Sequence, residues 1–118
     1  MTEADWPEEI RLSPDKTLLT LVFADGSSHA LAAEYLRVES PSAEVQGHSP
    51  DEKKTIGGKS KVRILALDPV GNYALKIRFD DGHDTGLFTW AYLKKLGVEH
   101  ATLWPNYLEK LAAAGLSR

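Results

Sequence analysis

Cysteine is absent from this chain of 118 residues. Its absence excludes disulfides, thiol nucleophiles, iron–sulfur clusters held by this chain alone and every zinc site that is built on cysteine. No apolar run approaches the ~20 residues that a membrane-spanning helix needs, so we expect no membrane partner. The first residues contain neither a basic segment nor an apolar one, so we expect no signal peptide and a cytoplasmic protein.

An excess of positive charge is also lacking, because the formal net charge is −3 at pH 7. Since nucleic-acid-binding domains are usually basic, we expect no nucleic-acid partner. The charge is unevenly distributed: residues 1–52 hold eleven acidic and three basic side chains, whereas residues 53–118 hold six acidic and eleven basic ones. The length suits one domain, and we predict a flexible tail over residues 1–7 and a single domain over residues 8–118.

Alternation of apolar and polar residues, interrupted by turn signals, predicts short strands joined in hairpins. We expect these strands over residues 8–13, 17–23, 28–31, 62–67, 73–79 and 84–88. A turn is expected over residues 68–72. We expect helices over residues 32–38, 90–96 and 103–116.

The ends of the last two helices carry their own signals. Thr89 is the expected N-cap of the second helix and Gly97 its stop. Pro105 fits the first turn of the final helix, with Thr102 or Asn106 as its cap.

Two stretches of the chain, residues 21–37 and 77–94, resemble each other. Each contains a strand, a Phe-x-Asp-Gly turn, a short strand and a helical segment with Tyr-Leu followed by Arg or Lys. Neither unit could bury its apolar face alone, so the two should share a core. We therefore predict an α+β fold, with an antiparallel twisted sheet built from two hairpin–helix units and a C-terminal helix packed on it.

Residues 39–61 form the longest segment without periodicity, and such a segment in a compact domain is usually functional or mobile. Its lysines form a basic cluster that could meet a phosphate or an acidic partner surface, or could simply be solvated. The cluster consists of Lys53, Lys54, Lys59 and Lys61, followed by Arg63. Residues 55–60 end like a Walker A loop, but Lys53 replaces the first glycine and a strand is expected to follow, so a flexible loop is favoured.

Several short motifs together resemble the DUF971 family, which is also called the γ-butyrobetaine hydroxylase-like N-terminal domain, here of the stand-alone bacterial type. The resemblance covers roughly residues 8–98. Its motifs are Tyr35-Leu36-Arg37, Ser40-Pro41-Ser42, Gln46-Gly47-His48, Val62-Arg63-Ile64, Phe79-Asp80-Asp81-Gly82-His83 and Trp90-x-Tyr92-Leu93. The resemblance implies relatives of three kinds. Some are small stand-alone bacterial proteins. Others lie in longer chains, either ahead of the 2-oxoglutarate/Fe(II) oxygenase domain of carnitine-pathway hydroxylases or behind ATPases that handle iron–sulfur clusters.

The hydroxylase branch of that family carries a structural zinc held by three cysteines and one histidine. The resemblance places the cysteine positions at Ser40, Ser42 and Val45, and the histidine at His83. Since serine is a poor zinc ligand and valine is none, we predict that this chain does not bind that zinc. His83 remains only a weak metal ligand.

No assembled set of catalytic residues is visible, so we expect a protein that is not an enzyme and needs no cofactor. The favoured hypothesis is a non-catalytic accessory domain that binds a protein partner. Its candidate residues are Arg37, His48, Lys53, Lys54, Lys59 and Lys61. The alternative is a metal-binding domain, for zinc or iron, associated with iron or iron–sulfur metabolism. The oligomeric state stays open.

Overall fold

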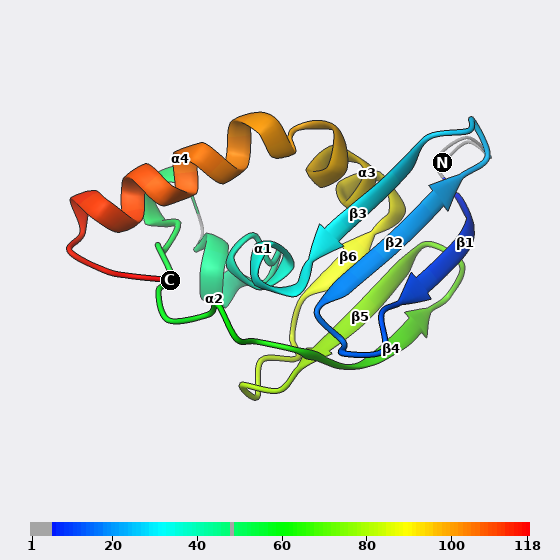
Figure 1. Cartoon of the computed structure of the whole chain (residues 1–118), viewed down its shortest axis with the longest axis horizontal. Helices are drawn as coiled ribbons and strands as arrows, with labels where there is room; N and C mark the ends of the chain where they lie inside the picture. Colours follow the sequence, from blue (N-terminus) through cyan, green and yellow to red (C-terminus); the bar gives the residue numbers. More distant parts are fainter. Residues whose placement is uncertain (1–5, 48) are drawn as a thin grey trace.

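Two β-β-β-α units and a long final helix make up the computed structural model, which describes residues 6–47 and 49–118 (Figure 1). The first unit comprises β1 (Pro7–Leu12), β2 (Leu18–Phe23), β3 (Ser28–Ala32) and α1 (Ala33–Val38). The second comprises β4 (Ile64–Val70), β5 (Ala74–Phe79), β6 (Leu87–Thr89) and α3 (Trp90–Val98). Between them lie α2 (Ala43–Gln46) and the 3-10 turn η2 (Pro50–Glu52), and α4 (His100–Ala113) ends the fold.

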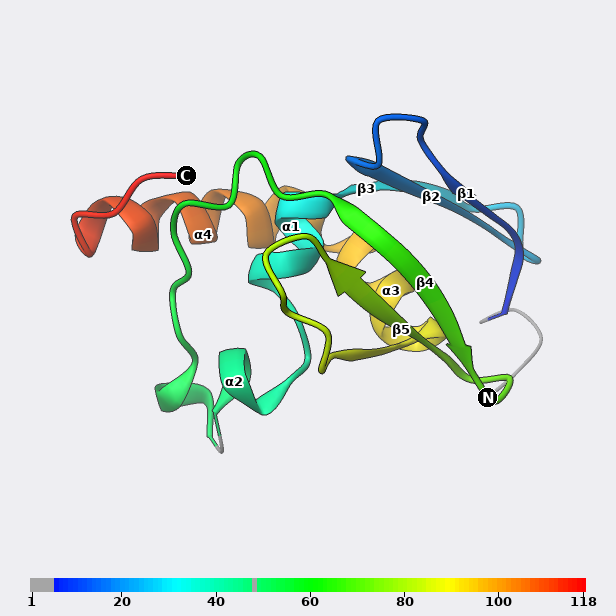
Figure 2. The ribbon, with the colours of Figure 1, turned by 90° about the horizontal axis from the view of Figure 1, so that it is seen from below.

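Each unit forms its own antiparallel three-stranded sheet, in the order β1-β2-β3 and β4-β5-β6. The α+β class is confirmed, with two small sheets where the sequence pattern suggested one. Figure 2 shows these sheets as separate layers. The inward-facing residues of both sheets share one apolar core with α1 and α3. The largest fully buried side chains in this core include Tyr35, Phe23, Phe79, Phe88, Leu21, Ile77 and Leu93.

The predicted repeat is visible in the hairpins that join β2 to β3 and β5 to β6. In the first, the Phe23 amide donates to Ser27 and the Gly26 amide donates to Phe23. In the second, the Phe79 amide donates to the His83 carbonyl, and the Gly82 amide to Phe79. Both glycines have positive φ, which the turn requires and which glycine adopts at low cost. The two units therefore share backbone geometry as well as sequence.

Helix ends differ from the sequence expectation, although Thr89 does cap α3 by accepting a hydrogen bond from the Tyr92 amide. Gly97 does not stop α3, which continues to Val98. Its role is steric, because a Cβ at this position would lie 2.4 Å from Cγ of His29 on β3. The final helix begins at His100 with Glu99 as its N-cap, so Pro105 lies inside it rather than in its first turn.

Two strands of the second sheet also have different bounds. β4 continues through residues 68–70, which were expected to turn, because Pro69 and Val70 pair with the start of β5. β6 begins only at Leu87. At the other end of the chain, Pro7 already belongs to β1, and residues 1–5 of the predicted tail lie outside the described residues.

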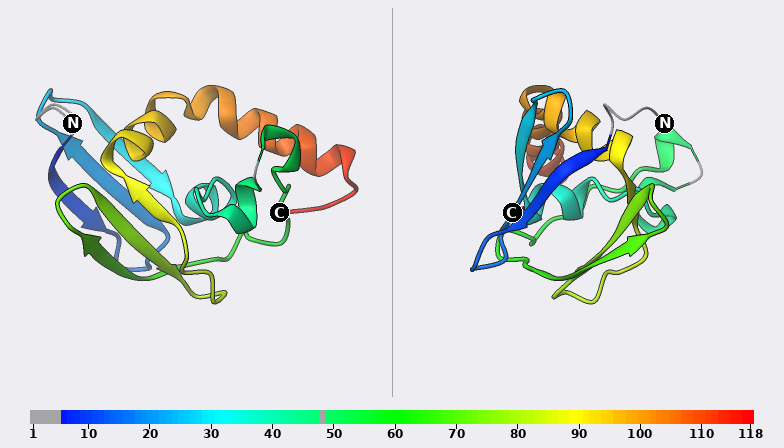
Figure 3. Two further views of the ribbon diagram at one scale, coloured as in Figure 1. Left: turned by 180° about the vertical axis from the view of Figure 1, so that it is seen from behind. Right: turned by 90° about the vertical axis from the view of Figure 1, so that its right-hand side faces the viewer.

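The segment over residues 39–61 is more structured than its composition suggests. After α2 it passes along the C-terminal half of α4 before reaching β4 (Figure 3). The Tyr107 hydroxyl of α4 donates to the Ile56 carbonyl, and the Gly58 amide donates to Ser117 beyond the helix. Among the described residues, none of the helices is both long and apolar enough to cross a membrane.

Candidate functional site

Three side chains that the family resemblance associates with zinc do meet in the structure. Ser40 lies just after α1, Ser42 is the N-cap of α2, and His83 lies in the turn between β5 and β6. Nε2 of His83 is 2.9 Å from the Ser40 hydroxyl and 3.3 Å from the Ser42 hydroxyl. The fourth position, Val45, is buried in α2.

The surroundings of His83 favour its neutral form. Burial lowers its pKa, and the nearby positive charge of Arg37 acts in the same direction, whereas Glu44 opposes them. Nδ1 lies 3.1 Å from a carboxylate oxygen of Glu44. We therefore assign the proton to Nδ1, which donates to Glu44 and leaves Nε2 to accept from the serine hydroxyls. The three segments are tied together by this one ring.

The donor set does not fit the zinc site of the hydroxylase branch. Neutral serine hydroxyls bind zinc poorly, and Val45 offers no donor. Among the described residues, no group of three or more histidine, aspartate or glutamate side chains is placed to hold a metal ion.

His83 lies between Ser40 and Glu44, as the histidine of a hydrolase triad lies between the serine and the carboxylate. Ser40, however, is fully buried. A Cβ on Gly86 would lie 2.4 Å from its hydroxyl, so the chain itself covers this oxygen. A substrate therefore cannot reach the Ser40 hydroxyl. The cluster instead connects the segment after α1, the start of α2 and the β5–β6 turn.

Arg37 and Lys59, both candidates for partner binding, converge on Asp81 instead. Nε of Arg37 and Nζ of Lys59 each lie 2.7 Å from the same carboxylate oxygen. Burial raises the pKa of Asp81, but Lys59, the His83 amide and Arg37 together lower it to about 2. Only 12% of the Arg37 side chain is exposed, so it joins α1 to the β5–β6 turn.

The glycine loop before β4 does not resemble a phosphate-binding loop in structure. The Gly58 amide donates to the Ser117 carbonyl, and a Cβ on Gly57 would lie 2.8 Å from that same oxygen. A strand follows, as the sequence indicated. The C-terminal residues therefore occupy the place that a nucleotide phosphate would need.

Lys53 and Lys54 lie elsewhere, on a groove that residues 39–46 and 53–55 form with helices α3 and α4. We call this the lysine groove. It consists of two adjoining hollows of about 60 and 260 Å³, which share Glu39, Lys53 and Leu103. The first is also lined by Val38, Lys54, Thr55, Asn106, Tyr107 and Lys110, and the second by Pro41, Gln46, Tyr92, Lys95 and Leu96.

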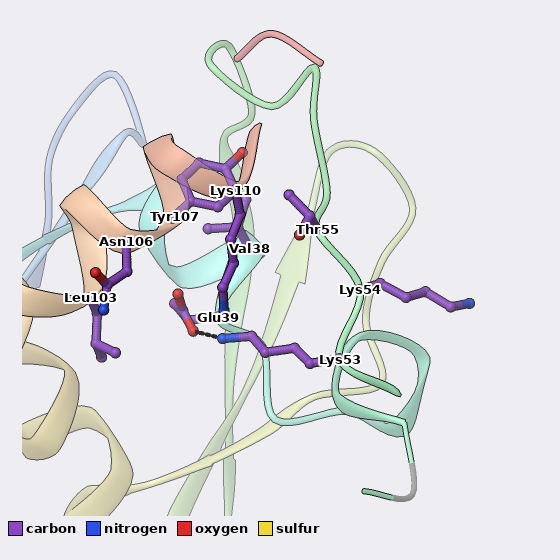
Figure 4. A pocket seen from close by; sticks show the side chains of 9 residues that line it. All are labelled: Val38, Glu39, Lys53, Lys54, Thr55, Leu103, Asn106, Tyr107 and Lys110. Carbon is purple, nitrogen blue, oxygen red and sulfur yellow. Dashed lines mark hydrogen bonds and ion pairs between the residues drawn. The ribbon is translucent and has the colours of Figure 1, made fainter. Parts of the chain in front are cut away.

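Glu39 forms the floor of the lysine groove. Its side chain is only 6% exposed and is paired with the ammonium group of Lys53, as Figure 4 shows. The Tyr92 hydroxyl donates to the Glu39 carbonyl, and the Tyr107 hydroxyl to Ile56, so both tyrosines fix the walls. Burial raises the pKa of Tyr92 and of Tyr107, and both phenols keep their protons for these bonds.

The predicted basic cluster is thus divided between two places. Lys53 and Lys54 line the groove, whereas Lys59 and Lys61 border a shallow surface beside Asp80 and Asp81. His48 lies outside the described residues.

Sequence reasoning missed Lys95 and Lys110 as groove residues. The available signal was helical spacing, because Lys110 follows Tyr107 by three residues and Lys95 follows Tyr92 by three. Their common neighbours, residues 39–46 and 53–55, could not be placed from periodicity.

The chain shares its fold and much of its sequence with known proteins. A solution NMR structure is 49% identical, covers 96% of this chain and 89% of that protein, and superposes with a TM-score of 0.81. A second is 43% identical over the whole chain and 89% of that protein, with a TM-score of 0.81. A crystal structure of a DUF971 protein of unknown function from Acidithiobacillus ferrooxidans is 36% identical over 82% of this chain and 98% of that protein, with a TM-score of 0.68.

Curated proteins offer no match to this sequence. Residues 10–94, most of the chain, match the family described as gamma-butyrobetaine hydroxylase-like, N-terminal. These residues run from the middle of β1 to the middle of α3. Together with the DUF971 relative, the match shows that the chain belongs to the gamma-butyrobetaine hydroxylase-like N-terminal domain family.

Proposed function

We propose that the chain is a non-catalytic accessory domain that binds a protein partner in the lysine groove. The observation that carries the proposal is the charge of this groove. Four lysines line it against one carboxylate, that of Glu39, in a chain whose net charge is −3. A basic groove on an acidic protein favours one orientation of an approaching partner and excludes others.

The groove is also preformed, which lowers the entropic cost of binding. Tyr92 and Tyr107 hold its walls by hydrogen bonds to backbone carbonyls, and Lys53 is anchored on Glu39. By contrast, the Ser40–His83 cluster is covered by the chain, so it supports no chemistry on a substrate. No observation on the described residues favours a second function.

Photo-crosslinking in cell extract tests the proposal. A photoreactive amino acid replaces Asn106, an exposed residue that lines the groove. We expect it to capture a discrete protein. The matched control carries the same amino acid at Arg78, which is exposed on β5 away from the groove, and should not capture that protein. Equal capture from both positions, or none from position 106, would contradict the proposal.

A further inference from the structure

Lys110 carries a positive charge that the groove itself does not neutralise. In Figure 4 its side chain descends from α4 toward the Glu39 carboxylate and the Lys53 ammonium group. Glu39 is already paired with Lys53. Among the described residues, Lys110, Lys54 and Lys95 form no ion pair. Two ammonium groups thus face one space beside a single carboxylate.

Apolar side chains surround these charges. Leu103 belongs to both hollows, and Leu96 and Pro41 line the larger one together with Lys95. Lys54 extends away from the smaller hollow, so it acts at the rim (Figure 4). A complementary ligand therefore carries carboxylates with apolar groups between them, and two adjoining hollows suit an extended chain.

A protein segment fits this surface better than a nucleic acid. Single-stranded nucleic acids are usually bound by aromatic rings on which bases stack. The rings of Tyr92 and Tyr107 are instead parts of the wall, fixed by their hydroxyl groups. We propose that the lysine groove binds an extended acidic protein segment, with one carboxylate between the ammonium groups of Lys53 and Lys110. This inference rests on the proposed function and adds the chemistry of the partner.

The experiment is an NMR titration of the full ¹⁵N-labelled chain. The probe is the peptide acetyl-Glu-Leu-Glu-Glu-Leu-Glu-amide, and the control peptide replaces each Glu by Gln. We expect saturable shifts confined to amides of residues 53–55, 95–96, 103–104 and 106–110, and weaker binding at high salt because the charges are screened. Lys110→Gln should weaken binding about threefold to fivefold, within the range of one partly exposed ion pair. Lys61→Gln, which removes an exposed lysine outside the groove, should leave it unchanged.

Three outcomes would overturn the inference: equal binding of the Gln peptide, shifts spread over lysines across the surface, or the same shifts with inorganic phosphate or a short oligonucleotide. The crosslinking at position 106 separates this failure from that of the proposed function. If the crosslinker captures a partner but the acidic peptide does not bind, the domain binds partners of another chemistry. If both experiments fail, both proposals fall.

Discussion

His83 is a buried titratable ring whose burial favours the neutral form. Its pKa is lowered in the folded chain, so the unfolded chain binds the proton more readily. The stabilisation that neutral His83 contributes is therefore complete above its pKa in the unfolded chain, about 6.5. It is lost as the pH falls toward the lower pKa of His83 in the folded chain. We expect the free energy of unfolding to decrease between pH 7.5 and 5.5, with a slope of at most about 1.4 kcal/mol per pH unit.

The measurement is urea unfolding across this pH range. His83→Gln keeps a hydrogen-bonding group near the serines but cannot titrate, so it should flatten the slope. His100→Gln, at an exposed histidine of α4, should retain it. Asp81, with a pKa of about 2, titrates well below this window. A slope that survives in His83→Gln would show that another group causes it.

The serine hydroxyls around His83 define a second prediction. Because both lie within 3.3 Å of Nε2, thiolates at positions 40 and 42 would approach the spacing of ligands around one zinc ion. We expect the triple variant Ser40→Cys, Ser42→Cys, Val45→Cys to bind one zinc per chain, as measured by elemental analysis. We expect the parent chain to bind none, with no change in its melting temperature on adding zinc.

Zinc should also raise the melting temperature of this triple variant, since a ligand that binds only the folded state stabilises it. Adding His83→Ala to the triple variant removes the fourth ligand and should weaken zinc binding. Stoichiometric zinc on the parent chain, or none on the triple variant, would show that the four positions do not form one site.

At the scale of elements, α3 and β3 are in close contact through Gly97. An alanine in a helix is intrinsically more favourable than glycine by about 1 kcal/mol. Here the added methyl group would lie 2.4 Å from Cγ of His29 and 2.7 Å from its Cβ, and the Cβ atom cannot move without the strand. The clash should exceed the gain, so we expect Gly97→Ala to lower the free energy of unfolding by about 1–3 kcal/mol.

A double variant isolates the cause of this effect. His29→Ala removes the ring atoms, which include the nearest contact with the new methyl group, and keeps only the Cβ contact at 2.7 Å. We expect Gly97→Ala to cost less in the His29→Ala background than in the parent chain, as thermal or urea unfolding would show. If the two costs simply add, the glycine has another role.

At the scale of the whole molecule, the sequence predicted the parts that depend on local patterns. The repeated Phe-x-Asp-Gly turns identified both hairpins, and Thr89 identified the start of α3. The sheets were harder to assign, because strand alternation does not say whether six strands form one sheet or two. The clustering of Ser40, Ser42 and His83 followed from the family resemblance, because spacing alone does not join residues separated by 41 or 43 positions.

The lysine groove could be predicted only in part, because it depends on long-range packing. Lys53 and Lys54 were candidates, but Lys95 and Lys110 belong to helices whose partner is an aperiodic segment. Arg37 and Lys59 were candidates for partner binding, but nothing local in the sequence indicates that Asp81 pairs with both. The sequence shows that a residue is positively charged, but it does not show which acidic side chain pairs with it.

The contact between Glu34 and Arg118 joins the first unit to the last residue of the chain. Glu34 on α1 has a side chain only 7% exposed, and Arg118 forms three hydrogen bonds to its two carboxylate oxygens. Arg118 also lies over the ring of Trp104 on α4. Removing the guanidinium group leaves a carboxylate that is almost wholly buried without its cation, which is more costly than removing both charges.

We therefore expect Arg118→Ala to reduce the free energy of unfolding by about 1–2 kcal/mol, a modest value because Arg118 is itself half exposed and water screens part of its charge. Glu34→Gln removes the buried charge, so Arg118→Ala should cost less in that background. Urea unfolding of the four chains measures this coupling. Equal costs in both backgrounds would mean that Arg118 stabilises the fold through its contact with Trp104 and not through the buried carboxylate of Glu34.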